Sequence, residues 1–162
     1  MVMMRKTLHR LAVSAFLSCL FIVNGAALNA QEQRLATNQV TIKSQTGEHT
    51  FTAEMAVSRE EKAQGMMFRT RMGDDEAMLF VYPEPQRMNY WMRNTYIPLD
   101  IIFIREDGRI LNIIRNAKPQ SEDPLKSRGL AIGTLEIRGG RAKELGIRPG
   151  DIVIHPLYGT DK

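Results

Sequence analysis

The residues with the clearest capacity for chemistry lie between positions 69 and 100. The segment NYWMRNTYIPLD, residues 89 to 100, contains the chain's only tryptophan together with an arginine, two asparagines and an aspartate. A tryptophan ring offers a flat apolar surface, and the planar fork of an arginine can grip a carboxylate or a phosphate. One interpretation is therefore a ligand-binding patch, whose candidate residues are Arg69, Trp91, Arg93, Asn94 and Asp100.

A purely structural role fits the same residues, and the single sequence favours it. Trp91 would then be a buried aromatic wedge, and Asn94 would form a turn with its own backbone. Asp100 would be the ion-pair partner of Arg69 or Arg93. Side chains alternate along a strand, so Trp91 and Arg93 would share one face while Asn94 would lie on the other. These side chains could line one pocket only if the chain bends at Asn94, which the proline four residues later favours.

Methionine is the second unusual feature of this region. Thioether sulfur favours Cu(I), so copper handling by methionine is a minor alternative function. The two histidines after residue 30, His49 and His155, are far apart in the sequence, and neither has a metal-ligand spacing. Methionine as an adaptable core filler is the favoured interpretation, and we expect no metal ion and no cofactor. The methionines concerned are Met66, Met67, Met72, Met78, Met88 and Met92.

Sequence motifs for catalysis are few. No cysteine follows residue 30, and there is no Gly-x-Ser-x-Gly nucleophile motif. The adjacent acids at 74–76 and 122–123 lie in polar, turn-like stretches and are typical of solvated surface. An enzyme needs a titratable group with a perturbed pKa beside a polar cleft. Burial of Asp100 or Glu136 in such a cleft without an arginine partner would favour an enzyme, whereas paired or exposed acids would favour a non-catalytic module.

The N-terminal thirty residues predict export from the cytoplasm. Residues 1–10 carry three basic residues other than histidine and no acid, residues 11–23 are almost entirely apolar, and small residues follow. This order is typical of a secretory signal peptide, with cleavage after Ala27 or Ala30. The apolar run of thirteen residues is short for a membrane span, which takes about 20 residues. An uncleaved membrane anchor and lipid attachment at Cys19 are the alternatives.

Charge and length limit the remaining classes of function. The chain has 22 Lys and Arg against 18 Asp and Glu; three of the basic residues and no acid lie in residues 1–30, which leaves 19 against 18. With no basic run or stripe, we expect no nucleic-acid partner. Contact with a membrane is expected only through the signal segment, if it stays uncleaved. The predicted organisation is a signal peptide at 1–30, a loose leader at 31–38 and one β-rich domain at 39–158.

Local patterns predict a mainly β fold with two short helices. Residues 40–57 have the two-residue period of a hairpin, and Asp-Gly between two apolar runs predicts a second hairpin over 99–115. Ser58 followed by Glu61 forms a capping-box pattern, which predicts a helix over 59–64. A second short helix is expected over 140–145. With about eight short strands and no alternation of strands and helices, we expect a compact antiparallel barrel or sandwich.

Several motifs of the chain resemble those of the domain of unknown function 192 family. They are GMMFR at 65–69, MLFVY at 78–82, YWMRNTYIPLDIIFI at 90–104, and LEIRGG with GIRPGD within 135–151. The similarity covers residues 40–157 in the correct order. The resemblance implies a small, exported protein with a compact β-rich fold, and it implies no activity.

These observations together favour an exported binding or accessory module without catalytic activity. Its partner would be a small anionic ligand or an extracytoplasmic protein, in the periplasm or outside the cell. The alternative is an extracytoplasmic hydrolase-like enzyme.

Overall fold

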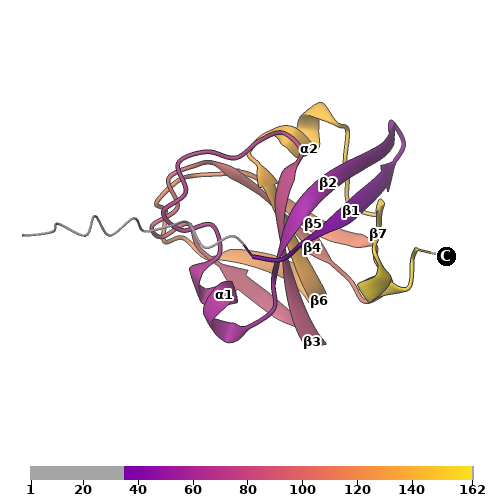
Figure 1. Cartoon of the computed structure of the whole chain (residues 1–162), viewed down its shortest axis with the longest axis horizontal. Helices are drawn as coiled ribbons and strands as arrows, with labels where there is room; N and C mark the ends of the chain where they lie inside the picture. The colour runs from indigo at the N-terminus through magenta and orange to yellow at the C-terminus, as the bar shows by residue number, and fades with distance from the viewer. Residues whose placement is uncertain (1–34, 162) are drawn as a thin grey trace, which may run out of the picture. The chain divides into compact units, whose positions relative to one another are not determined.

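The computed structural model describes residues 35–161, which form one β-rich unit (Figure 1). The predicted signal peptide at 1–30 and its alternatives lie outside the described residues. Among residues 35–161, no helix is long and apolar enough to cross a membrane. The strands are β1 (Thr37–Ser44), β2 (Gly47–Ala56), β3 (Glu76–Tyr90), β4 (Leu99–Ile104), β5 (Ile110–Ala117), β6 (Leu125–Arg138) and β7 (Ile152–Ile154). The helices are α1 (Arg59–Gln64), α2 (Arg141–Glu144) and a short 3-10 helix (Pro156–Tyr158).

One curled sheet contains all seven strands, in the order β5-β4-β6-β3-β2-β1-β7. The predicted mainly β fold with two short helices is thus confirmed, and its strands are mostly antiparallel. The strand pair β2 and β3 is parallel, a departure from the antiparallel expectation. A parallel pair needs a long crossover connection, and residues 57–75, which include α1, supply it.

The sheet is curled, so that its two end strands, β5 and β7, approach each other. Arg109, next to β5, forms an isolated bridge with Ile152 of β7, and the Ile110 amide donates to the Asp151 carbonyl at 2.8 Å. β1 lies next to β7 in the sheet and begins at Thr37, two residues before the predicted start of the domain, so Thr37 and Asn38 belong to the sheet and not to the predicted loose leader at 31–38. β1 pairs with both β2 and β7, so its residues are ordered by ladders on two sides.

Local sequence signals explain where α1 begins. The Glu61 amide donates to the Ser58 hydroxyl at 3.1 Å, and the Ser58 amide donates to the Glu61 carboxylate at 2.8 Å. This is the predicted capping box, and the helix occupies the predicted residues. α1 then lies over β3, where the Lys62 ammonium donates to the Val81 carbonyl at 2.9 Å.

The two faces of the sheet bury two separate apolar clusters. Because successive side chains of a strand point to opposite faces, Leu79 and Leu135 belong to the first cluster and Met78 and Phe80 to the second. Four of the six methionines considered above are buried in the second cluster, and a fifth packs against it, so their predicted role as core filler is confirmed. The four are Met66, Met78, Met88 and Met92.

Candidate functional site

Two glutamates lie in the methionine-rich face of the sheet. Glu54 of β2 is paired with Met78 of β3, and Met78 is paired with Glu136 of β6. The two acids therefore lie two strands apart in one row, and at about 4.8 Å per strand their backbones are about 10 Å apart. Both are buried. Burying a charged group in an apolar layer costs free energy, so this row of residues is a candidate functional site.

Arg69 neutralises the first of these acids. Its two terminal nitrogens donate to the two carboxylate oxygens of Glu54 at 2.6 and 2.7 Å. The side chains of the pair are only 15% and 12% exposed. The prediction that Asp100 would be the partner of Arg69 is wrong. The parallel pairing of β2 with β3 places the crossover segment, and Arg69 with it, beside Glu54.

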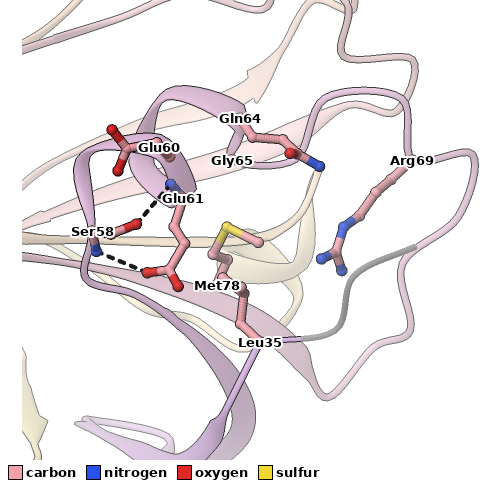
Figure 2. Close-up of a pocket in the computed structure, with 8 residues that line it drawn as sticks. All are labelled: Leu35, Ser58, Glu60, Glu61, Gln64, Gly65, Arg69 and Met78. Atoms are coloured by element: carbon pink, nitrogen blue, oxygen red, sulfur yellow. Dashed lines mark hydrogen bonds between the residues drawn. The ribbon is translucent and has the colours of Figure 1, made fainter. Parts of the chain in front are cut away.

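A pocket of about 210 Å³ opens beside this ion pair (Figure 2). Figure 2 shows the Arg69 guanidinium on one side of the pocket and Met78 on its floor. Two of its polar side chains, Ser58 and Glu61, are engaged in the capping box, and the backbone amides of Ser58 and Val57 lower the pKa of the Glu61 carboxyl. The lining residues are Leu35, Ser58, Glu60, Glu61, Gln64, Gly65, Arg69 and Met78.

A second, smaller cavity of about 50 Å³ shares Gln64 and Gly65 with this pocket, and it contains Glu136. Glu136 is only 5% exposed, and no group within residues 35–161 hydrogen-bonds its carboxyl. Burial raises the pKa of Glu136 to about 8, although the charge of Arg69 partly opposes this shift. The lining residues are Lys62, Ala63, Gln64, Gly65, Met66, Met67, Phe80, Tyr90, Trp91, Thr95, Leu99 and Glu136. We call this space the Glu136 cavity.

Hydroxyl groups and aromatic rings lie close to Glu136, and of the residues concerned only Phe80 and Tyr90 line the cavity. The hydroxyls of Tyr82 and Tyr90 are 2.8 Å apart, and burial raises the pKa of both phenols. The Tyr90 ring packs edge-on against Phe80, with 5.4 Å between centroids. In the part of the chain that the structure describes, the buried Thr134 hydroxyl has no hydrogen-bond partner. Thr134 is two residues before Glu136 on β6, so both side chains point to the same face of the sheet.

Trp91 lies at the rim of the Glu136 cavity and is 51% exposed. The predicted buried wedge is therefore wrong. β3 ends at Tyr90, so the strand alternation does not extend to Trp91, and the buried neighbour is Met92. The Arg93 guanidinium lies 5.2 Å from the centre of the Trp91 ring and donates to the Glu122 carboxylate at 3.0 Å.

The predicted bend at Asn94 is present. Asn94 has a φ of 56°, in the left-handed region that asparagine tolerates, and its carbonyl accepts a 2.8 Å hydrogen bond from the Phe68 amide. Phe68 also has a positive φ, of 66°. This hydrogen bond joins the crossover segment to the turn after β3. The Asn94 side chain is exposed and lines neither the larger pocket nor the Glu136 cavity.

Asp100 has a structural role at another place in the fold. It is fully buried, and its carboxylate accepts hydrogen bonds from the backbone amides of Asn116, Gly140 and Ala142 at 2.6, 3.0 and 2.8 Å. It therefore tethers the start of α2 to β4 and β5. The predicted arginine partner is absent from these contacts, because backbone amides satisfy the carboxylate instead.

The five predicted site residues therefore do not form one patch. Arg69 lies in the larger pocket and Trp91 in the Glu136 cavity, with Gly65 lining both. Lys62, Tyr90 and Thr95 were missed as lining residues. The sequence signal that could have indicated this site was Glu136, an acid between the apolar residues Leu135 and Ile137. In the structure both faces of this strand are covered.

The chain was also compared with known proteins. Residues 40–155 match the model of the family DUF192 (Uncharacterized ACR, COG1430). The chain belongs to this family. Comparison with curated proteins gives no match.

Two solved structures support the fold. A protein of unknown function from Novosphingobium aromaticivorans is 46% identical, with a TM-score of 0.74, and the match covers 76% of this chain and 88% of that one. A protein from Sinorhizobium meliloti, described as a "putative transcription regulator", is 40% identical, with a TM-score of 0.73 and coverage of 75% and 95%.

Among the His, Cys, Asp and Glu side chains of residues 35–161, no cluster of three or more could hold a metal ion. The Glu136 cavity brings together a carboxyl, a phenol, a lysine side chain and aromatic rings.

Proposed function

We propose that this DUF192 domain is a non-catalytic binding module that takes a small ligand into the Glu136 cavity. The observation that carries the proposal is a buried carboxyl that faces a cavity without a hydrogen-bond partner among the described residues. Such a group costs free energy in the absence of a ligand, and a ligand that hydrogen-bonds to it recovers that cost.

The surroundings of Glu136 have the usual composition of a ligand site. Aromatic and aliphatic side chains form most of the wall, and a few polar groups converge on the space. Trp91 at the rim provides a half-exposed flat surface that an incoming ligand can contact. The arginines that were expected to hold an anion are ion-paired, Arg69 with Glu54 and Arg93 with Glu122. We therefore base the proposal on Glu136 and not on those arginines.

A ligand screen tests this proposal. Small neutral, anionic and cationic compounds would be added to the full chain while the fluorescence of Trp91 and the melting temperature are recorded. A binding compound is expected to change both, and Glu136→Gln is expected to weaken that response. The matched control is Glu84→Gln, which changes an exposed glutamate of β3. If no compound of any charge gives a response that depends on Glu136, the proposal is wrong.

A second candidate function is acid–base catalysis by Glu136, which meets the criterion set above for an enzyme: it is a buried acid at a cavity and forms no ion pair with an arginine of the described residues. This function is favoured by the raised pKa of about 8, because a general acid or base works best with a pKa near the working pH. Asp100 is not a candidate for this role, since three backbone amides hold its carboxylate in a structural role. Conversion of a bound compound by the wild type but not by Glu136→Gln would support an enzyme. Binding without turnover would support the module.

We also propose that the protein acts outside the cytoplasm. The support is the charged, apolar and small-residue order of residues 1–30. Intact-mass measurement on protein from the extracytoplasmic fraction is expected to show a chain shortened by about thirty residues. Recovery of the full-length chain from the cytoplasm alone would contradict this proposal.

A further inference from the structure

The chemical class of the ligand can be inferred from the walls of the Glu136 cavity. We propose that the cavity takes the ammonium head group of a small primary amine, with Glu136 as its counter-ion. This inference rests on the proposed binding function and adds the charge and size of the group that enters.

Three kinds of contact in the cavity suit a cation. The first is the Glu136 carboxyl, which becomes a counter-charge when it ionises. The second is the set of aromatic rings of Phe80, Tyr90 and Trp91, which line the cavity. The face of an aromatic ring attracts cations, and Trp91 already holds the Arg93 guanidinium in this way. The third is the polarizable thioether groups of Met66 and Met67.

A carboxylate or phosphate would meet Glu136 as a like charge once the carboxyl ionises, whereas the protonated carboxyl below a pH of about 8 can donate a hydrogen bond to such an anion. The affinity for an anion should therefore fall as the pH rises, opposite to that for an amine.

Size restricts the head group further. A buried water needs a cavity volume of about 10 to 15 Å³. The Glu136 cavity, of about 50 Å³, therefore has room for roughly three to five groups of the size of a water molecule. A primary ammonium with one or two carbons fits this space. A sugar ring or a nucleotide base would have to remain outside it, at the Trp91 rim.

One ammonium group near the cavity is already held by an aromatic ring and a carbonyl. Lys62, which also lines the cavity, places its ammonium 4.6 Å from the centre of the Tyr82 ring and donates to the Val81 carbonyl. Tyr82 and Val81 do not line the cavity, so this contact shows only that an aromatic ring and a carbonyl hold a cation near it. The Lys62 charge also repels a second cation. Replacing Lys62 by glutamine is therefore expected to tighten amine binding, whereas it would weaken the binding of an anion.

Binding of an amine is coupled to the release of a proton from Glu136. The charged and titratable groups near Glu136 are Arg69 from the crossover segment, which favours its ionised form, Lys62 of α1, which lines the same cavity, and Tyr82 and Tyr90 of β3. Because the carboxyl is protonated below a pH of about 8, a cation must displace that proton. The affinity is expected to rise about tenfold per pH unit between pH 6 and 7 and to level off above pH 8.

The test uses methylammonium chloride as the probe, with the full chain and constant ionic strength. Sodium chloride, sodium acetate and methanol are the cationic, anionic and neutral comparisons. A probe with two heavy atoms reaches at best a Kd of roughly 5 to 10 mM, so the titration extends to several hundred millimolar. Trp91 fluorescence and melting temperature are the readouts. We expect a saturable response to methylammonium, at least tenfold weaker in Glu136→Gln, unchanged in Glu84→Gln and stronger in Lys62→Gln.

The other outcomes separate the two proposals. If methanol or acetate gives a response that depends on Glu136 and methylammonium gives none, the amine inference is wrong and the binding function stands. If no probe gives such a response, including those of the wider screen, both are wrong. If Glu136→Gln fails to fold, the pH dependence of the wild type and the effect of Lys62→Gln decide. An affinity that is independent of pH, or weakened by Lys62→Gln, would overturn the amine inference.

Discussion

Replacing Glu136 by glutamine is expected to change how the stability of the protein depends on pH. The pKa of Glu136 is about 8 in the folded chain, compared with an ordinary value of 4.5. Between pH 4.5 and about 8, Glu136 is therefore protonated in the folded state and ionised in the unfolded state. Stability from Glu136 is fully present below pH 4.5 and is lost as the pH rises to about 8. A glutamine side chain does not ionise in this range, so the unfolding free energy of the variant does not fall in this way.

The magnitude follows from the gap between these two values. Each pH unit corresponds to about 1.36 kcal/mol, so the gap from 4.5 to about 8 corresponds to a loss of about 5 kcal/mol for the wild type. Between pH 4.5 and 8, the wild type should therefore lose about 4 to 5 kcal/mol of unfolding free energy relative to Glu136→Gln.

Urea unfolding at several pH values measures this difference. The slope with denaturant should stay the same for both proteins, so that the comparison reports stability and not a change in compactness. Glu122→Gln is the control, and its stability should follow the wild type at every pH. A constant difference between wild type and Glu136→Gln over this pH range would refute the assignment of Glu136 as a buried, protonated acid.

Three further substitutions test the surrounding structure, each through the free energy of unfolding. Trp91→Ala should cost only about 1 kcal/mol because the ring is half-exposed, and a cost above about 3 kcal/mol would restore the buried wedge. Arg69→Ala should cost about 3 to 5 kcal/mol because it leaves Glu54 as a buried charge without its bidentate partner, and a cost below about 1 kcal/mol would contradict that pairing. Asp100→Ala should cost about 3 kcal/mol or more because three backbone amides lose their acceptor, and amide exchange at Gly140 and Ala142 should rise; unchanged exchange would speak against this tether.

The elements of the fold were predictable because their signals are local. Ser58 and Glu61 are three residues apart, and their capping box alone determines where α1 begins. The Asp-Gly turn at 107–108 likewise connects β4 to β5 within one short segment. The parallel pairing of β2 with β3 has no such local signal, since it depends on how the nineteen residues between the strands pack.

The candidate site depended on those long-range pairings. Arg69 meets Glu54 only because β2 and β3 are neighbours, and sequence reasoning assigned Arg69 to Asp100 instead. Glu136 alternates with Leu135 and Ile137, a pattern that also suits an acid on a solvated face. It is buried because β6 lies between β4 and β3 and both of its faces are covered. Trp91 was misplaced because β3 ends one residue before it.

Direct titration of the Glu136 carboxyl would test both whether Glu136 is a buried, protonated acid and whether it binds the amine. Carbon-13 NMR of the glutamate side-chain carboxyls, followed against pH, would identify Glu136 as the resonance that is missing in Glu136→Gln. We expect this resonance to titrate near pH 8 in the free protein and at a lower pH when methylammonium is bound. A Glu136 resonance that titrates near pH 4.5, with or without the amine, would contradict both the buried acid and its role in binding.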